Sequence, residues 1–282
     1  MTVPPLPAVM TEPLVRTALL EDLGRAGDIT TDAIVPQSAT AETALVARHA
    51  GVVAGLDLAL MAFRLVEPLI AAETARPDGS RIARGDVIAV LRGPARGMLT
   101  AERVALNFLC HLSGIASATA SVVESIRGTR ARVVCTRKTL PGLRAVQKYA
   151  IRVGGGFNHR FGLDDGVLIK DNHIAAAGSV GAAVARIRAA IGHLVKVELE
   201  VDTLAQLEEA LGLGVDAVLL DNMSNDDMRR AVTMVAGRAL TEASGRITPA
   251  SAPAVAATGV DLLSSGALTH SSSTLDIGLD YR

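Results

Sequence analysis

The sequence predicts an α/β protein in which a β/α barrel follows a smaller mixed α/β unit. From Arg132 onward, short β-branched runs alternate with stretches of helical periodicity, which is typical of parallel strands joined by helical crossovers. Every predicted strand also ends in polar or charged residues, and a β/α barrel builds its site from the carboxyl ends of all its strands. A doubly wound sheet would place a Gly-x-Gly-x-x-Gly turn after its first strand. The triple glycine Gly154–Gly156 precedes no helix of that kind.

The first hundred residues have the pattern of a mixed α/β unit. We expect a helix over Pro13–Asp22, a strand over Ala41–Arg48 and a second helix over Asp57–Leu69. Two short strands around a Gly-Asp turn are expected over Arg81–Gly93. Thr100 is a residue type that caps helices, so it predicts the start of a long helix, Ala101–Arg127. The Ser113-Gly114 pair predicts an interruption of that helix.

The remaining residues provide the strands and helices of the predicted barrel. The strands are expected over Val133–Thr136, Gly166–Lys170, Val195–Val201, Ala217–Asp221, Ala239–Glu242 and Val260–Leu263. The helices are expected over Gly142–Val153, Val180–Ile191, Leu204–Leu211, Asp226–Val235 and Pro249–Thr258.

Composition excludes several classes of protein. A net charge of -1 argues against nucleic acid as a partner, because nucleic-acid binders carry a basic bias. No run approaches 18 consecutive apolar residues, so no membrane span is expected. The Pro-rich segment Met1–Thr11 lacks the features of a signal peptide, and Cys110 and Cys135 both suit buried, reduced thiols. We therefore expect a cytoplasmic protein.

Five cationic or protonatable side chains lie near glycine-rich turns or strand ends: Arg137, Lys138, His159, Arg160 and Lys170. In a barrel, their three segments converge at one end. Arg matches carboxylates and phosphates through its planar fork, and Lys provides a compact charge. The cluster indicates a small polyanionic ligand. A set of solvated surface charges is the alternative.

Acidic and Ser-Gly segments complete the same end of the predicted barrel. Glu198 and Glu200 lie on one face of a strand, so we expect them at different depths near the mouth. Asp221 ends the next strand, where it would hold Mg²⁺ or ribose hydroxyls, or cap a helix. Ser244-Gly245 and Ser265-Gly266 follow the last two strands, where barrel loops commonly bind phosphate.

These segments resemble those of the quinolinate phosphoribosyltransferase family across nearly the full length of the chain. The matching motifs are Thr136–Arg144, Gly154–Arg160 (Gly-Gly-Gly-x-Asn-His-Arg), Leu168–His173 (Leu-Ile-Lys-Asp-Asn-His), Leu220–Asn222, Glu242–Gly245 and Gly266–Ser271. The resemblance implies an N-terminal α/β domain of residues 1–102, which the segment 268–282 joins, and an open β/α barrel of residues 103–267.

The resemblance also implies the reaction of phosphoribosyl pyrophosphate with quinolinate, with Mg²⁺, to give nicotinate mononucleotide, pyrophosphate and CO₂. Arg137, His159 and Arg160 would clamp the quinolinate carboxylates, and Lys138 and Lys170 would face carboxylate and phosphates. Glu200 and Asp221 would hold ribose hydroxyls and, through the ribose or pyrophosphate, the metal. The catalytic set would be Lys138, Lys170, Glu200 and Asp221. The full substrate-binding set would be Arg103, Thr136, Arg137, Lys138, His159, Arg160, Lys170, Glu200, Asp221, Ser244, Gly245, Arg246, Ser265, Gly266 and Ala267.

Arg103 matches an arginine that enters the neighbouring subunit's site in the family, so the resemblance implies a homodimer with shared active sites. Further assembly of dimers is left open. Arg246 and Ser265 depart from the family pattern, which has Gly and Val there, so the details of phosphate binding are not predicted. A paralogue on the same barrel, acting on another aromatic acid or serving molybdenum uptake, is one rival interpretation. A non-catalytic anion-binding barrel is another, but it would be expected to have lost one of the acids or lysines.

Overall fold

The computed structural model describes residues 3–282, which divide into two compact units. Unit 1 comprises residues 3–120, 140–155 and 271–282, and unit 2 comprises residues 121–139 and 156–270. The domain boundary predicted after residue 102 falls within one long helix, α4 (Ala95–Ser125). The first two residues of the predicted N-terminal domain lie outside the described residues.

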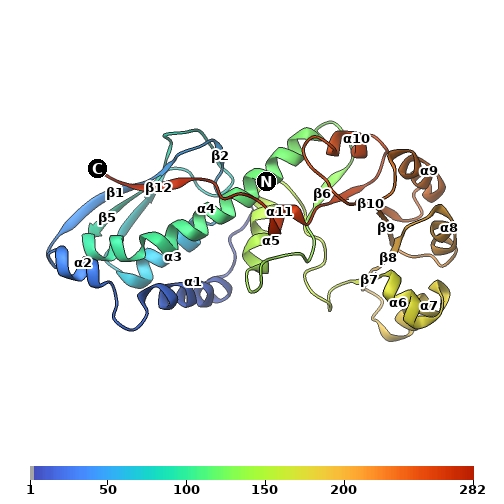
Figure 1. Ribbon diagram of the computed structural model, residues 1–282, viewed down its shortest axis with the longest axis horizontal. Coiled ribbons are helices and arrows are strands. Elements are labelled where there is room, and N and C mark those ends of the chain that lie inside the picture. The colour runs from blue at the N-terminus through green and yellow to red at the C-terminus, as the bar shows by residue number, and fades with distance from the viewer. Residues whose placement is uncertain (1–2) are drawn as a thin grey trace. The chain divides into compact units, whose positions relative to one another are not determined.

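Unit 1 is built on a four-stranded antiparallel sheet in the order β12-β1-β5-β3 (Figure 1). Its strands are β1 (Thr40–Ala47), β3 (Ala71–Thr74), β5 (Val87–Pro94) and β12 (Ile277–Tyr281). Its other helices are α1 (Ala8–Leu23), α2 (Ile29–Ile34), α3 (Leu56–Val66) and α5 (Arg144–Val153). The C-terminal strand β12 pairs with β1, so the end of the chain belongs to this unit.

The two strands predicted around the Gly-Asp turn are present, but they do not pair with each other. The first strand, β4 (Arg81–Ile82), pairs with β2 (Gly51–Val52), and β5 pairs with β1 and β3. Gly85 does form a turn with φ of +90°, as glycine permits. A local turn signal predicts a reversal of the chain and leaves the partner of each strand undecided.

Helix α4 begins at Ala95 and runs without interruption, so both predictions about it are wrong. Thr100 lies inside the helix, where its hydroxyl donates a hydrogen bond to Asp28 (3.1 Å). A Cβ atom at Gly114 would lie 2.1 Å from the carbonyl oxygen of Ser273. Gly114 therefore permits the C-terminal segment to approach the helix closely, rather than breaking the helix.

Helix α4 is also long and apolar enough, by length and composition, to cross a membrane. Half of its most apolar window is buried inside the protein, and Leu109, Leu112 and Ile115 have no exposed surface. The core helix of a soluble protein passes the same test of length and hydropathy, so this is weak evidence for a membrane span.

Unit 2 is a six-stranded parallel sheet in the order β6-β11-β10-β9-β8-β7. The strands are β6 (Arg132–Val134), β7 (Val167–Ile169), β8 (Val197–Val201), β9 (Ala217–Asp221), β10 (Leu240–Ser244) and β11 (Leu262–Ser264). All six predicted strands are confirmed. Strands β6 and β7 are the two edges of the sheet, so the barrel is open between them, and the predicted fold class is confirmed. Strand β10 continues two residues beyond its predicted end.

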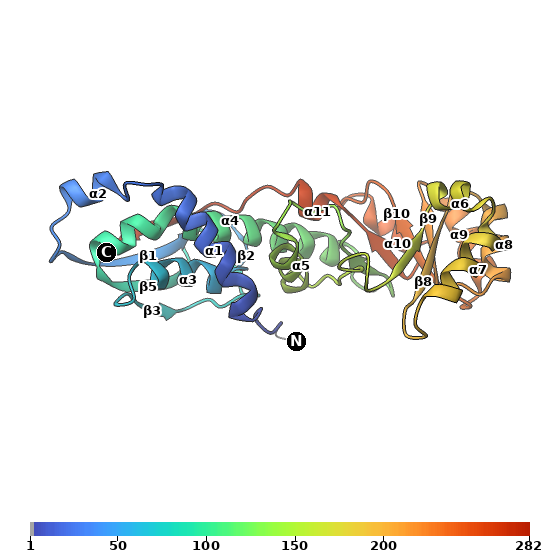
Figure 2. The ribbon, with the colours of Figure 1, turned by 90° about the horizontal axis from the view of Figure 1, so that it is seen from below.

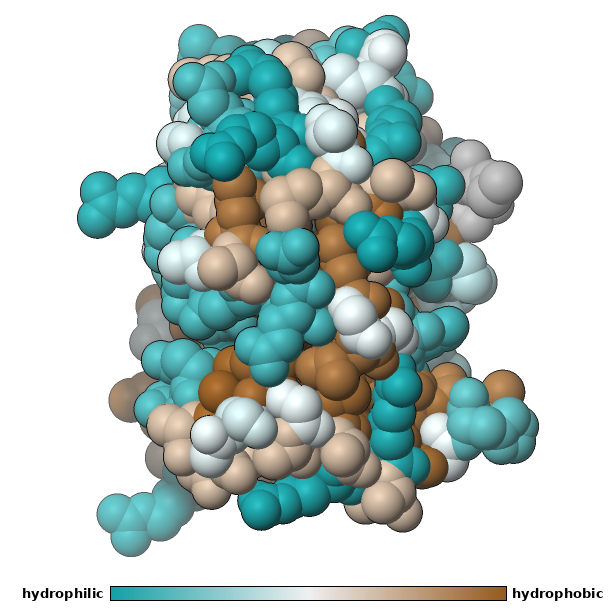
Figure 3. Space-filling model, turned by 90° about the vertical axis from the view of Figure 1, so that its right-hand side faces the viewer, coloured by the Kyte–Doolittle hydropathy of each residue, from teal (hydrophilic) through white to brown (hydrophobic). Residues whose placement is uncertain are grey.

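Helices α7 (Val180–Ala190), α8 (Leu204–Gly212) and α9 (Asn225–Val235) lie on the outer side of this sheet (Figures 1 and 2). Three short helices complete the unit: α6 (Asp171–Ala177), α10 (Ala252–Ala256) and α11 (Ala267–His270). Figure 3 views the side that carries α7, α8 and α9, where hydrophilic side chains stand out and hydrophobic ones lie mostly deeper between them. Solvent therefore faces the helices, and the carboxyl ends of the strands are left for a site.

Candidate functional site

A pocket of about 400 Å³ lies at the carboxyl ends of the strands of unit 2. It brings together nine residues predicted from the sequence: Thr136, Arg137, Lys138, His159, Arg160, Lys170, Glu200, Asp221 and Ser244. The other residues that line it are Leu168, Leu219, Glu242 and Ser264. The pocket therefore gathers four Lys or Arg side chains and three carboxylates from segments about a hundred residues apart in sequence.

Hydrogen bonds to threonine hydroxyls fix both the N–H and the carbonyl of Lys138. Its N–H donates to the hydroxyl of Thr136 (3.0 Å), and its carbonyl accepts from the hydroxyl of Thr269 (2.7 Å). A Cβ atom at Gly266 would lie 2.8 Å from the side chain of Lys138. The glycine therefore leaves space for the lysine side chain, and the two threonines fix the turn that carries it.

Arg160 lies in the loop after Gly154–Gly156, between α5 and β7. Its Nη1 donates to the carbonyl of Gly166 (2.9 Å). Burial and the nearby positive charge of Arg137 lower the pKa of Arg160 from its ordinary value, although a guanidinium stays protonated in proteins. Two neighbouring guanidinium groups in one pocket repel each other, so the pocket favours an anion between them.

Lys170 and Glu200 form an ion pair across the pocket, from the ends of β7 and β8. The Lys170 N–H donates to Nδ1 of His173 (2.9 Å), one turn into α6. The side chain of His173 thereby fixes the backbone at the point where Lys170 leaves the strand. Asp221 ends β9, and its carboxylate accepts from the side chain of Asn222 (2.8 Å). Asn222 has φ of +51°, a conformation that Asn adopts more readily than most residues.

The predicted phosphate-binding segments lie beside this pocket, and of them Ser244 lines it. Ser265 is buried, and its hydroxyl donates to the carbonyl of Ile247 (3.3 Å). Gly245 has φ of +148°, which favours glycine. Arg246 and Ala267 are exposed. Their roles in phosphate binding stay predictions.

Arg103 lies on the exposed side of α4 in unit 1. It is not among the residues that line the pocket of unit 2. Its predicted role concerns a neighbouring subunit and stays a prediction.

Sequence reasoning missed a buried cluster of His159, Glu198 and Glu242. Their ligand atoms lie within 4.8 Å of one another. Nε2 of His159 lies 2.9 Å from Glu198 and 3.6 Å from Glu242. Glu242 was expected at a strand end, but β10 continues past it, and the side chain is 1% exposed. Burial, and next the negative charge of Glu198, raise the pKa of Glu242 to about 7, while His159 partly offsets this rise.

The arrangement of Glu198 and Glu200 on one face of β8 was the available signal for this cluster. The two were expected at different depths, and 10% of the Glu198 side chain is exposed against 14% for Glu200. No feature of the sequence indicated that Glu242 would lie beside Glu198, because their strands are separated in the sheet by β9.

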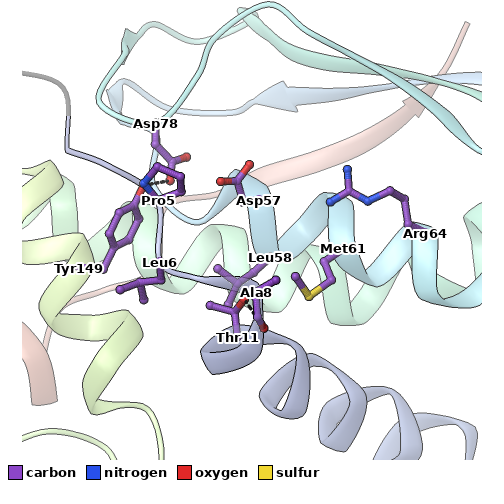
Figure 4. Close-up of a pocket in the computed structure, with 10 residues that line it drawn as sticks. All are labelled: Pro5, Leu6, Ala8, Thr11, Asp57, Leu58, Met61, Arg64, Asp78 and Tyr149. Carbon is purple, nitrogen blue, oxygen red and sulfur yellow. Dashed lines mark hydrogen bonds between the residues drawn. The ribbon is translucent and has the colours of Figure 1, made fainter.

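A second pocket, of about 260 Å³, lies within unit 1 between the N-terminal segment and α3 (Figure 4). There the hydroxyl of Tyr149 donates to the carboxylate of Asp78 (2.8 Å). The same carboxylate accepts the N–H groups of Gly55 (2.8 Å) and Leu56 (3.0 Å) at the start of α3. Burial raises the pKa of Asp78 and of Tyr149. These bonds give Asp78 a structural role as the cap of α3, and none of the predicted site residues lines this pocket.

Two family models match the chain: the N-terminal domain of quinolinate phosphoribosyl transferase over residues 28–113, and its C-terminal domain over residues 115–280. The nicotinate-nucleotide pyrophosphorylase [carboxylating] of Mycobacterium leprae is 47% identical over 94% of this chain and 95% of its own. A probable enzyme of the same name from Bacillus subtilis is 44% identical over 93% of this chain and 90% of its own. The crystal structure of NadC from Streptococcus pyogenes has a TM-score of 0.94 at 44% identity and covers 99% of both chains. The similarity extends over both units.

Proposed function

Because this chain belongs to the quinolinate phosphoribosyl transferase family, we propose that its pocket carries out the family's reaction. The enzyme transfers the phosphoribosyl group of phosphoribosyl pyrophosphate to quinolinate. The products are nicotinate mononucleotide, pyrophosphate and CO₂, and the reaction serves NAD biosynthesis. One observation supports this most strongly: four cationic side chains converge with Glu200 and Asp221 in one pocket at the carboxyl ends of the strands.

The cations suit a dicarboxylate and a polyphosphate together. Arg137 and Arg160, which repel each other, would each bind a carboxylate of quinolinate by charge-assisted hydrogen bonds. Lys138 and Lys170 would bind the remaining carboxylate and phosphate oxygens. The predicted clamp by His159 is less direct, since both of its ring nitrogens already have partners in the protein: Nε2 with Glu198, and Nδ1 with the Arg160 N–H (2.7 Å).

The carboxylates of Glu200 and Asp221 suit the ribose of phosphoribosyl pyrophosphate. As the bond from the anomeric carbon to pyrophosphate breaks, positive charge develops on the ribose, and carboxylates held nearby stabilise it. The ring nitrogen of quinolinate then forms the new bond. Loss of CO₂ leaves an electron pair on the ring carbon beside the cationic nitrogen, which stabilises it until a proton arrives.

Mg²⁺ belongs to the proposal as the partner of the pyrophosphate. Glu200 and Asp221 offer carboxylate oxygens, the donors that Mg²⁺ prefers, although Glu200 is already paired with Lys170. The residues present therefore fit the ion, with Asp221 the more available donor. Bound there, Mg²⁺ would neutralise charge on the leaving pyrophosphate.

A homodimer in the cytoplasm completes the proposal. Arg103 is exposed on α4, where it could contribute a cation to the pocket of a second copy. The family resemblance of this segment supports that role. Assembly beyond the dimer is left open.

The reaction can be tested directly. The protein is incubated with quinolinate, phosphoribosyl pyrophosphate and Mg²⁺, and nicotinate mononucleotide and CO₂ are measured. Nicotinate, which lacks the second carboxylate, is the control substrate and should react far more slowly. Equal rates with the two acids would contradict the assignment of quinolinate.

Arg160→Ala should raise the KM for quinolinate strongly and leave that for phosphoribosyl pyrophosphate nearly unchanged. Loss of a charge-assisted hydrogen bond costs about 1.5–3 kcal/mol, or roughly a ten- to hundredfold rise in KM. Steady-state kinetics with each substrate varied in turn gives the two values. Arg229→Ala, on the exposed side of α9, is a matched control that should change neither. A similar rise for both substrates would argue against the carboxylate-binding role.

A further inference from the structure

Arg160 directly precedes a surface loop, residues 161–165, that contains no helix or strand and no buried residue. Its two large apolar residues, Phe161 and Leu163, are 47% and 74% exposed. Hydrophobic burial therefore contributes little to the order of this loop, and other bonds must offset the entropy lost when its backbone is fixed. Because Arg160 lines the pocket, the bonds that order the loop also bear on the direction of its guanidinium.

Asp165 supplies those bonds. Its two carboxylate oxygens accept the N–H groups of two consecutive residues, Phe161 (2.6 Å) and Gly162 (2.8 Å). One side chain thereby connects the end of the loop to its beginning. A carboxylate suits this role because both of its oxygens accept hydrogen bonds, and bonds to a charged acceptor are stronger than those between neutral groups.

The residues on either side of the loop are also bonded to each other. Nη1 of Arg160 donates to the carbonyl of Gly166 (2.9 Å). That carbonyl belongs to the residue directly after Asp165, so a shift of the Asp165 backbone moves the acceptor of the guanidinium as well. Asp165 therefore acts on Arg160 at two points: on its backbone through Phe161, and on its guanidinium through Gly166.

A purely electrostatic role for Asp165 is the alternative. Burial and the positive charge of Arg137 lower the pKa of Arg160, and two carboxylates, Glu198 and Asp165, oppose this. Asp165 is the weaker of the two. Its geometry indicates a different role, since each of its oxygens accepts a backbone N–H of the loop.

We propose that Asp165 is a positioning residue, which orients Arg160 in the substrate pocket through the loop that it closes. Orientation matters because displacing a group by about 1 Å can cost on the order of a hundredfold in rate. Asp165 thereby sets the affinity for the second carboxylate of the substrate and the preference for quinolinate over nicotinate. The part of this inference that concerns quinolinate rests on the proposed function.

Two variants of Asp165 separate positioning from charge. Both remove the same charge, but Asp165→Asn keeps one oxygen acceptor and Asp165→Ala keeps none. The KM for quinolinate should rise at least about tenfold in Asp165→Ala and only about threefold in Asp165→Asn. The KM for phosphoribosyl pyrophosphate should stay near its native value in both. Asp164→Asn, at the adjacent exposed acid, is the matched control and should change neither KM.

Three kinetic outcomes would overturn the proposal. Equal rises in Asp165→Asn and Asp165→Ala, or a similar rise in Asp164→Asn, would assign the effect to charge. A loss of activity that follows the folded fraction, with both KM values unchanged, would give Asp165 a purely structural role. Thermal unfolding of each variant provides the folded fraction. If Asp165→Ala does not fold, the comparison of Asp165→Asn with Asp164→Asn decides the matter.

Two measurements on the protein without substrate test the loop itself. Hydrogen exchange at the amides of Phe161 and Gly162 should be faster in Asp165→Ala than in Asp164→Asn. In spectra of protein with ¹⁵N-labelled arginine, the guanidinium signal of Arg160, identified by its absence from Arg160→Ala, should change in Asp165→Ala. Unchanged exchange, or an unchanged Arg160 signal, would contradict the positioning role. If the native protein does not convert quinolinate, the proposed function fails, while these two measurements still decide the role of Asp165.

Discussion

Asp221→Asn and Glu200→Gln are each expected to lower kcat by about 100- to 1,000-fold, while the KM for quinolinate changes far less. Removing one group that stabilises charge in a transition state has an effect of this size. Both carboxylates line the pocket from strand ends, where they can face the ribose as positive charge develops on it. Interactions made mainly in the transition state affect kcat more than substrate binding. Steady-state kinetics at saturating phosphoribosyl pyrophosphate measures the effect.

The two variants should differ in a second respect. Glu200 is paired with Lys170, so Glu200→Gln also releases that lysine and should alter the KM for phosphoribosyl pyrophosphate. Asp221 is bonded to the neutral side chain of Asn222, so Asp221→Asn should not have this additional effect. Glu209→Gln, on the exposed side of α8, is the matched control. An unchanged kcat in Asp221→Asn would refute the electrostatic role.

Arg103→Ala and Lys138→Ala should each be nearly inactive alone, and a mixture of the two should recover roughly a quarter of the native activity. If Arg103 enters the partner's pocket, a mixed dimer has one site with both residues intact and one site with both defects. Random reassortment in a two-fold dimer makes about half of the dimers mixed, and one of their two sites works. Activity is measured after the two variants are unfolded and refolded together.

The control is each variant carried through the same unfolding and refolding alone, with the native protein setting the full value. Two outcomes contradict shared sites. If Arg103→Ala remains active alone, Arg103 is only an exposed charge on α4. If mixing restores nothing, Arg103 serves the pocket of its own chain.

The positions of the cationic residues could be predicted because they follow from local properties. Strand β7 and Lys170 are adjacent in sequence, and a parallel strand delivers the residue after it to one edge of the sheet. The same holds for Asp221 at the end of β9 and for Lys138 after β6. Alternation of β-branched and helical segments was enough to predict all six strands of unit 2, since each depends on its own residues.

Predictions failed where the answer depends on a distant part of the chain. The Gly-Asp turn predicted two strands but not their partners: β4 pairs with β2, and β5 pairs with β1 and β3. The Ser113-Gly114 pair is typical of a helix interruption. Gly114 instead leaves space for the backbone of Ser273, some 160 residues away in sequence. Thr100 has the side chain of a cap, but the helix already extends to Ala95, so its hydroxyl bonds to Asp28 instead.

By itself the sequence determined the barrel, its strands and the convergence of cations and acids at one end, because these follow from residue periodicity and from the polarity of a parallel sheet. Only the tertiary structure decided the environment of each group. Glu198 and Glu242 have the same side chain, but His159 compensates one and leaves the other buried without a hydrogen bond. The charge of a buried carboxyl depends on the partners that the fold places around it, and no spacing in the sequence records those partners.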